Sequence, residues 1–312
     1  MTDKNDKAAC RAKGPKAEGH VFKVGLTLLL VVSVLQSVAA AAPPTVAALQ
    51  IVAPNGKESV LIPGLHAAAR DILLPDSRLW DGKKRLLVEH MDTGEAEQLA
   101  MVFVPHEPEP RAPWAQNLTA AELRIYHDRA RCDDVVETQA DWLLSRPSPW
   151  LANLFAYSTC SPFVSRDTEI TREAQALKLD VVPLETDEFA AEQRIGLPPD
   201  VSEGAFRWAL AHDPTTVLNE SAALINAGRY ADMRKLADES WGEPRFARTA
   251  NLVLVEQRNM HWMTILEREL DLGGNVILVG ADHLPGRNGL IALLRSAGYS
   301  VTATKLGAVR AQ

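Results

Sequence analysis

The sequence has few cysteines, few aromatic residues and no excess of positive charge. Its 312 residues include three cysteines and no Cys-x-x-Cys pair, which excludes a structural zinc ribbon. Lysine and arginine number 33 against 40 aspartates and glutamates, and no basic stripe interleaved with aromatic residues occurs, so we expect no nucleic-acid partner. Hydrophobic residues make up 46% and charged residues 23% of the chain, which is typical of a globular protein with a sizeable core.

The N-terminus has the pattern of an export signal. Basic residues precede an almost uncharged apolar run from Val24 to Val38, and small residues from Ala39 to Ala42 offer a cleavage site. We therefore expect residues 1–42 to be a signal peptide and the protein to be exported, either periplasmic or secreted. The apolar stretch also approaches the ~20 residues that span a bilayer, so an uncleaved N-terminal membrane anchor is the alternative, and the only expected contact with a membrane.

The remaining chain, residues 43–312, is acidic. Six of the 33 basic and three of the 40 acidic residues lie in the first 42 positions, which leaves 27 against 37 and a net charge of −10. Two cysteines remain in this part, Cys132 and Cys160. An exported protein permits a disulfide between them, and two buried free thiols are the alternative.

The clearest chemistry lies in the last sixty residues. Asn275 to Val279 is an apolar, β-branched run between glycines, which predicts a strand buried on both faces. It is followed by a Gly-x-x-His sequence that ends at His283, then by a helical apolar pattern that closes at Gly298, and by a final strand from Tyr299 to Thr304. Ligands of open α/β sheets bind beyond the carboxyl ends of strands, which is where this order places His283.

The helix before that strand carries two polar residues on its apolar side. Five residues at helical spacing predict one buried stripe: Leu252, Val255, Trp262, Leu266 and Leu270. Asn259 lies on this stripe and Arg258 lies beside it. A buried amide and a buried guanidinium need partners, so the pair either anchors a neighbouring loop or faces a polar site.

Four further strands are predicted earlier in the chain. Ala47 to Val52 and Glu58 to Ile62 flank an Asn-Gly turn and predict a hairpin, whose second strand continues into Pro63-Gly64-Leu65-His66. Arg85 to Val88 predicts a strand that ends at Glu89, and Leu179 to Leu184 predicts one that ends at Glu185. Taken alone, each carboxylate could be a solvated loop residue or, for Glu185, part of a helix start. His90 is a spare candidate, and His106 and His127 have no partner spacing and are expected on the surface.

These motifs resemble the TraB/GumN family, whose relatives include the Tiki proteases and erythromycin-esterase-like and ChaN-like proteins. The resemblance rests on motifs in the family's order: Arg258-Asn259, Gly280-Ala281-Asp282-His283-Leu284, Gly289-Leu290, Gly298-Tyr299 and Leu184-Glu185-Thr186. It implies a first Gly-x-x-His after the hairpin and a glutamate after the next strand, which correspond to His66 and Glu89. Pro63 stands where the first glycine of the family belongs, so the turn that carries His66 must be built differently.

Two histidines and two carboxylates at strand ends suit a divalent metal ion. His66, His283 and Glu89 are the expected ligands of manganese, cobalt or zinc. Glu89 or Glu185 would act as general base, and Arg258 or Asn259 would stabilise an oxyanion. The resemblance thus implies a metal-dependent hydrolase, with metalloprotease-like chemistry, that cleaves an amide or ester bond of a peptide or other substrate in the cell envelope.

A non-catalytic role is the alternative. Because the first motif is altered, the site could instead serve as a groove that binds a peptide or a polysaccharide in the envelope. For the fold we expect an α/β domain with a central mixed β-sheet flanked by helices, and a helical insertion or cap near residues 187–245. The strand order does not follow from the sequence.

Overall fold

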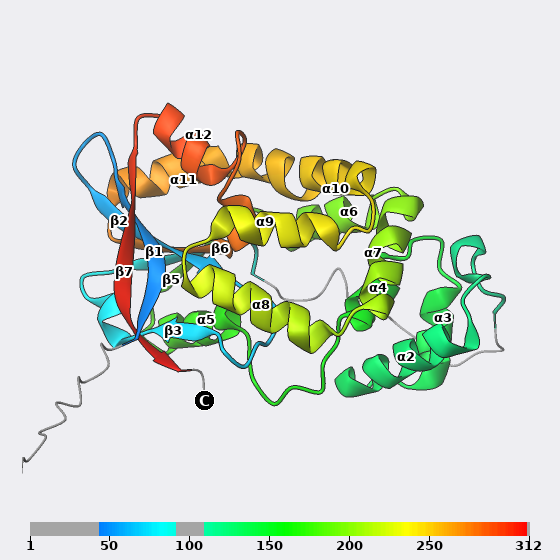
Figure 1. The fold of residues 1–312 in the computed structure, drawn as a ribbon. Helices are drawn as coiled ribbons and strands as arrows, with labels where there is room; N and C mark the ends of the chain where they lie inside the picture. Colours follow the sequence, from blue (N-terminus) through cyan, green and yellow to red (C-terminus); the bar gives the residue numbers. More distant parts are fainter. Residues whose placement is uncertain (1–43, 92–108, 311–312) are drawn as a thin grey trace, which may run out of the picture. The chain divides into compact units, whose positions relative to one another are not determined.

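The strands form a mixed sheet, as expected (Figure 1). The computed structural model describes residues 44–91 and 109–310, so the predicted export signal and His106 lie outside the described residues. Within this part of the chain the sheet has seven strands in the order β3-β7-β1-β2-β6-β4-β5. The strands are β1 (Thr45–Val52), β2 (Glu58–Gly64), β3 (Leu73–Pro75), β4 (Arg85–Val88), β5 (Asp180–Pro183), β6 (Asn275–Gly280) and β7 (Ser300–Arg310).

The first two strands form the predicted hairpin. Gly56 has a φ of +81°, a left-handed conformation that glycine adopts without strain, and the Ala53 N–H donates to the Lys57 carbonyl at 2.8 Å. On the other side of β1, strand β7 pairs antiparallel with it along its whole length. β7 runs to Arg310, six residues beyond the predicted end, because this pairing continues and β3, which was not predicted, adds to its last residues.

Four neighbouring strands, β2, β6, β4 and β5, are parallel. Gly64 at the end of β2 lies beside Gly280 at the end of β6, and Val88 of β4 lies between Leu278 and Pro183. Every residue of β6 is buried, as the unbroken apolar run predicted. Because parallel strands end at the same edge of a sheet, the four segments that follow these strands start side by side.

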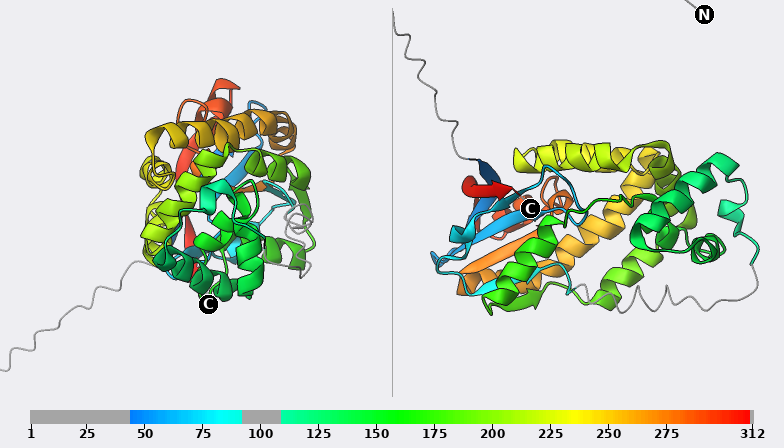
Figure 2. Two further views of the ribbon diagram at one scale, coloured as in Figure 1. Left: turned by 90° about the vertical axis from the view of Figure 1, so that its right-hand side faces the viewer. Right: turned by 90° about the horizontal axis from the view of Figure 1, so that it is seen from below.

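Helices cover both faces of the sheet (Figures 1 and 2). Ile277 of β6 packs in a core with Trp262 and Leu290, on the side of the C-terminal helices, whereas Val276 and Leu278 pack in a second core with Ile170 on the opposite side. The helices that pack in or around these cores are α5 (Arg166–Ala176), α8 (Pro214–Asn226), α9 (Tyr230–Glu239), α11 (Arg258–Leu272) and α12 (Leu290–Ser296).

The remaining helices gather around separate apolar clusters beyond the sheet edge. Those are α2 (Ala120–Ala130), α3 (Glu137–Leu144), α4 (Trp150–Ala156), α7 (Pro199–Ala211) and α10 (Pro244–Asn251). Helix α6 (Asp187–Ile195) contacts α4. From β5 to β6 the regular elements are helical, and helices also separate β4 from β5. None of the helices in the described part of the chain is both long enough and apolar enough to cross a membrane.

A disulfide joins Cys132 to Cys160 across 28 residues, with their Cα atoms 4.7 Å apart. Cys132 follows α2, and Cys160 lies in the segment that leads from α4 to α5. Of the two alternatives left open by the sequence, the structure has the disulfide.

The helix before β6 departs from the predicted stripe at one position. Val255, Trp262, Leu266 and Leu270 are buried, but Leu252 is 48% exposed. Residues Leu252–Gln257 form a π-helical segment between α10 and α11. A π turn contains more residues than an α turn and shifts the positions that follow it around the axis, so the α-helical spacing placed Leu252 on the wrong side.

Candidate functional site

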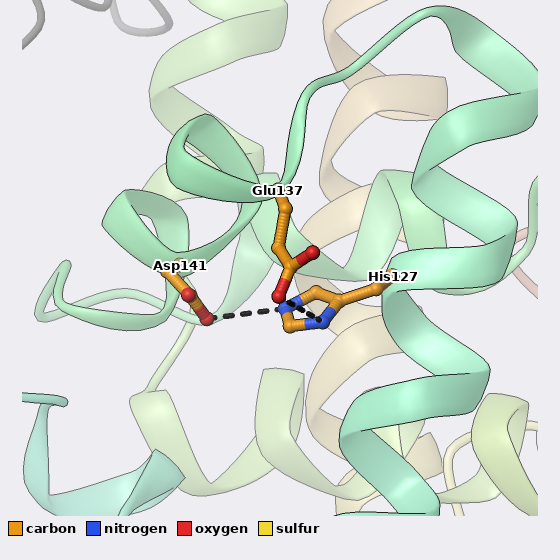
Figure 3. Close-up of side chains that lie close together, drawn as sticks. All are labelled: His127, Glu137 and Asp141. Carbon is orange, nitrogen blue, oxygen red and sulfur yellow. Dashed lines mark hydrogen bonds and ion pairs between the residues drawn. The ribbon is translucent and has the colours of Figure 1, made fainter.

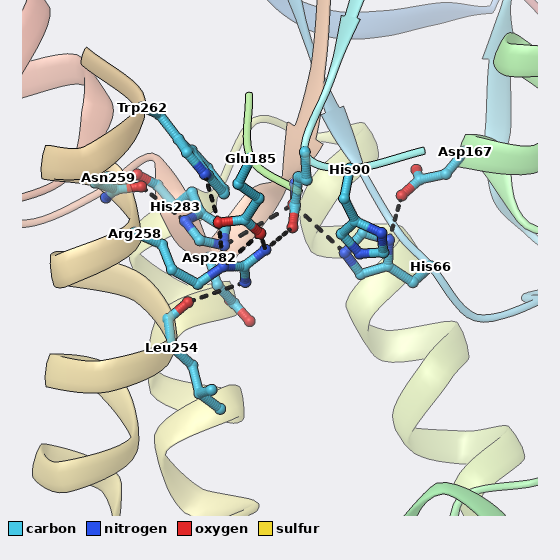
Figure 4. Close-up of polar contacts among 12 residues, drawn as sticks. His66, His90, Asp167, Glu185, Leu254, Arg258, Asn259, Trp262, Asp282 and His283 are labelled. Atoms are coloured by element: carbon cyan, nitrogen blue, oxygen red, sulfur yellow. Dashed lines mark hydrogen bonds and ion pairs between the residues drawn. The ribbon is translucent and has the colours of Figure 1, made fainter. Parts of the chain in front are cut away.

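The expected site residues come together at the carboxyl ends of the four parallel strands (Figure 4). His66 follows β2 and Glu89 follows β4, and Glu185 lies two residues beyond β5. His283 closes a short 3-10 turn, Ala281–His283, directly after β6. Arg258 and Asn259 reach the same place from the start of α11, where both are buried.

Glu89 lies at the centre of the group. Its Oε1 accepts the Gly280 N–H at 2.6 Å, and its Oε2 accepts a hydrogen bond from Arg258 Nη2 at 2.8 Å. The Nε2 atoms of His66 and His283 lie 3.5 and 3.9 Å from the same Oε1. Burial works to raise the pKa of Glu89, but the positive charges of His66 and Arg258 hold it well below its usual range. Glu89 is therefore an ionised carboxylate that faces two imidazoles.

Asn259 sets the orientation of His283. The Asn259 side-chain nitrogen donates to the carbonyls of His283 and Asn288, at 3.1 and 2.9 Å, so its oxygen is the atom that faces His283 Nδ1 at 2.7 Å. That oxygen can only accept, so the proton of the neutral ring is on Nδ1 and a lone pair remains on Nε2. Burial lowers the pKa of His283 to about 3 and keeps the ring neutral at physiological pH.

Glu185 is a hydrogen-bond partner of Arg258. Both oxygens of Glu185 accept from Arg258, with Nε at 2.9 and 3.2 Å, and Oε2 also accepts the indole N–H of Trp262 at 2.8 Å. Arg258 Nη1 donates to the Leu254 carbonyl at 3.1 Å, within the π-helical segment. These bonds, with the one to Glu89, use four of the five guanidinium hydrogens, and the second hydrogen on Nη1 has no acceptor among the described residues.

His66 reaches the group in spite of Pro63, and a residue that the sequence did not reveal holds it there. Asp167, the second residue of α5, lies with Oδ2 2.6 Å from His66 Nδ1, while its Oδ1 accepts the Leu65 N–H at 2.8 Å. Desolvation by neighbouring groups works to lower the pKa of His66, whose side chain is still 61% exposed, but Asp167 and Glu89 raise it well above the usual value. Asp167 lies about a hundred residues from His66 in the chain, and no local spacing signals the contact.

The group faces a cavity of about 850 Å³. This volume is within the ~300–1,000 Å³ typical of small-molecule sites. His66, Glu89, Arg258 and His283 line it, whereas Glu185 and Asn259 are outside its lining. Part of the cavity lining is apolar, and we define this apolar wall as Trp150, Leu154, Trp241, Ala250 and Leu254.

The comparison with protein families gave a match over most of the chain. The profile of the TraB/PrgY/gumN family matches residues 78–303. The chain belongs to this family. The matched range contains Glu89, Glu185, Arg258, Asn259 and His283. It begins after His66, so the assignment of His66 to the site depends on the contacts described above. The searches of curated proteins and of solved structures gave no match.

The donor atoms at this site of the TraB/PrgY/gumN chain are of the kinds that bind a divalent metal ion. His66 and His283 both have Nδ1 occupied by a hydrogen-bond partner, Asp167 or Asn259, and both direct Nε2 towards a carboxylate, a pattern common among metal-binding histidines. A Cβ placed on Gly280 would lie 3.1 Å from Glu89 Oε1 and 3.5 Å from the imidazole of each histidine. The missing side chain of Gly280 therefore keeps open the space between the three donor groups.

These donor atoms lie farther apart than the ligands of one bound ion do. Within the described ranges, three ligand atoms lie within 4.8 Å of one another only in the group His127, Glu137 and Asp141. Since both predicted histidines lie within 3.9 Å of Glu89 Oε1, the long separation is the one between the two imidazoles. An ion at this place requires His66 and His283 to approach each other.

The other group, around His127, is a polar link between two helices (Figure 3). Asp141 Oδ1 lies 3.1 Å from His127 Nε2, and Glu137 Oε1 lies 3.7 Å from Nδ1, so the carboxylates of α3 face different nitrogens of one ring on α2. A single ion cannot be shared by both ring nitrogens. His127 was expected on the surface; its side chain is only 14% exposed and has two acidic neighbours, which the spacing in the sequence did not signal.

Proposed function

We propose that this protein is a metal-dependent hydrolase that cleaves an amide or ester bond in a peptide or other carbonyl substrate. The observation that carries the proposal is the convergence of His66 Nε2 and His283 Nε2 on one oxygen of an ionised Glu89, at the wall of a cavity. Two imidazoles and a carboxylate are a common ligand set of hydrolytic metal sites, and such sites leave a position open for water.

The chain's own residues take distinct roles in this proposal. His66, His283 and Glu89 would hold the ion, and manganese, cobalt and zinc are the candidates. When bound, a divalent ion supplies Lewis-acid activation of water and of a carbonyl group. Glu89 keeps one acceptor position on Oε1 beside the bond from Gly280. This position either binds the ion or, where the two histidines hold the ion without it, takes a proton from an attacking water.

Arg258 is the residue that meets the developing negative charge. Its unpaired Nη1 hydrogen and its place in the cavity lining allow it to donate to the oxygen of the attacked carbonyl. Glu185 and Asn259, which the sequence suggested as base and oxyanion donor, act as positioning residues in this proposal. Glu185 fixes Arg258 and Asn259 fixes His283, and the bonds already made leave neither free for a substrate.

For its location, we propose that the protein is exported and acts in the cell envelope. The disulfide between Cys132 and Cys160 supports it, since disulfides persist in oxidising compartments. A substrate in the envelope, such as a peptide, would be met there.

Metal content and peptide hydrolysis test the proposal together. The protein is purified without chelator, supplied in turn with manganese, cobalt and zinc, and compared with His283→Ala. We expect one bound ion per chain and cleavage of a peptide library in the wild type, and loss of both in the variant. His90→Ala is the matched control, because His90 also lines the cavity but bonds to Asp187 and Arg194 instead of facing Glu89. Wild-type protein that binds none of the three ions and cleaves nothing would overturn the proposal.

The apolar wall favours a second candidate function, a non-catalytic groove for a peptide or a polysaccharide. Two tryptophans, Trp150 and Trp241, lie in this wall, and aromatic faces pack well against apolar side chains and sugar rings. Ligand binding in the presence of a chelator separates the two candidates. A binding groove keeps its affinity without metal and without Glu89, whereas the hydrolase loses activity under both conditions.

A further inference from the structure

The two histidines of the site are held by different means. After β6, the Leu284 N–H donates to the Ala281 carbonyl at 3.2 Å, so the chain closes its own short turn and delivers His283 three residues beyond Gly280. After β2, the described backbone has no such turn at residues 65 and 66, and the histidine follows Gly64 by only two residues. Something other than the local backbone must fix His66.

Asp167 supplies the missing constraint. One of its oxygens accepts the Leu65 N–H at 2.8 Å and the other lies 2.6 Å from His66 Nδ1, so a single carboxylate holds both the main chain and the ring. With Nδ1 engaged, the ring must turn its Nε2 towards Glu89, at 3.5 Å. Asp167 therefore does for His66 what Asn259 does for His283.

Gly64 is required here for space. A Cβ on Gly64 would lie 2.6 Å from Asp167 Oδ1 and 2.8 Å from Oδ2, closer than real Cβ contacts come. Gly64 is not among the residues with a positive φ, so the need for glycine is steric and not conformational. Its missing side chain lets the carboxylate of α5 approach the end of β2.

Arg166 fixes the segment that carries His66 at both ends. This fully buried guanidinium donates to the Pro63 carbonyl at 2.7 Å and to the Leu73 carbonyl at 2.9 and 2.7 Å, and also to Asn226 Oδ1 at 2.6 Å. Pro63 precedes the segment and Leu73 follows it. Although burial lowers the pKa of Arg166 to about 10, the group stays charged at neutral pH, and the negative charge of Asp167 favours this.

We propose that Arg166 and Asp167 at the start of α5 are positioning residues that replace the Gly-x-x-His turn lost at Pro63 and hold His66 in the orientation that binds metal. The inference rests on the proposed metal site, and it deepens that function by giving the altered first motif a working geometry. It also removes the reason to regard Pro63 as the mark of a degenerate site.

Two variants test the role of Asp167 by different routes. Asp167→Ala removes the carboxylate, and Gly64→Ala keeps it but displaces it with a methyl group. We expect each to lower the affinity for Co²⁺, measured by calorimetry and by the visible spectrum of the bound ion, by roughly ten- to a hundredfold. Asp187→Ala is the matched control, since Asp187 pairs with His90 at the same cavity and not with a proposed ligand. This control should bind Co²⁺ as the wild type does.

A second measurement does not depend on metal. Hydrogen exchange of the Leu65 amide should be accelerated at least roughly tenfold in Asp167→Ala and Gly64→Ala, because the Leu65 N–H loses its acceptor, while amides of β6 keep the wild-type rate. If the wild type binds no metal but Leu65 exchange responds as expected, the proposed function fails and the positioning of the segment stands. Wild-type affinity for Co²⁺ together with unchanged Leu65 exchange in both variants would overturn the inference.

Discussion

Asn259 and His283 hold each other in one arrangement. The amide oxygen of Asn259 faces His283 Nδ1 at 2.7 Å, and its amide nitrogen donates to the carbonyl of His283 itself at 3.1 Å. The ring and the main chain of one histidine are thus fixed by one side chain. This relationship gives Asn259 a role at the site without contact with the substrate.

Asn259→Ala should weaken metal binding through His283. Without the amide, the ring is free to turn and either nitrogen can carry the proton, so we expect roughly ten- to a hundredfold lower affinity for Co²⁺ by calorimetry. Asn251→Ala is the control, because Asn251 also lines the cavity but bonds to Asp238. Equal affinity in Asn259→Ala and wild type would show that His283 does not need this partner.

Gly280→Ala should close the space for the ion and leave the fold intact. The φ of Gly280 is −51°, which alanine adopts without strain, but the added Cβ would lie 3.1 Å from Glu89 Oε1. We expect the variant to lose metal binding, with little change in the urea concentration at which half of the protein is unfolded. Gly56→Ala should give the opposite result, because its φ of +81° is strained for alanine and the residue is in the hairpin turn, at the end of β2 opposite to His66. A Gly280→Ala variant that binds metal normally would contradict the placement of the ion.

Glu185→Ala should be strongly destabilising. The change leaves Arg258 buried with only Glu89 as a counter-charge and removes the acceptor of the Trp262 N–H. Breaking a buried ion pair costs on the order of 3–5 kcal/mol, so we expect the free energy of unfolding in urea to fall by about that much. Asp232→Ala, which breaks the exposed pairs with Arg229 and Lys235, should leave it nearly unchanged. Similar small effects of the two substitutions would show that Glu185 is not needed to hold Arg258.

Removal of the disulfide should lower stability through the unfolded state. The bridge spans 28 residues, and closing a loop of that length contributes about 3–4 kcal/mol in the chain-entropy account. We expect the double variant Cys132→Ser, Cys160→Ser to lose about that free energy of unfolding while it still binds Co²⁺. Treatment of the wild type with a reductant should reproduce the loss, and leave the double variant unaffected. A reductant that destabilises both proteins equally would exclude the disulfide as the cause.

Much of the site could be predicted because its signals are local. An apolar run between glycines determines a buried strand such as β6, and Asn55-Gly56 determines the hairpin, since each depends on the conformations of a few consecutive residues. A residue directly after such a strand is then known to lie at the carboxyl edge. This placed His66, Glu89 and His283 at one edge before any strand order was known.

Contacts between distant segments were decided only by the tertiary structure. Asp167 meets His66 because α5 packs beside the end of β2, and no spacing within the chain encodes that approach. Leu252 became exposed because a π-helical segment shifts the helix face, and α-helical periodicity cannot show such a shift. The sequence by itself determined which residues stand at the sheet edge. The packing of α5 and α11 decided which of these residues face the cavity and which residues hold them in place. Burial and hydrogen-bond partners depend on segments that lie far apart in the chain, so the sequence alone does not reveal them.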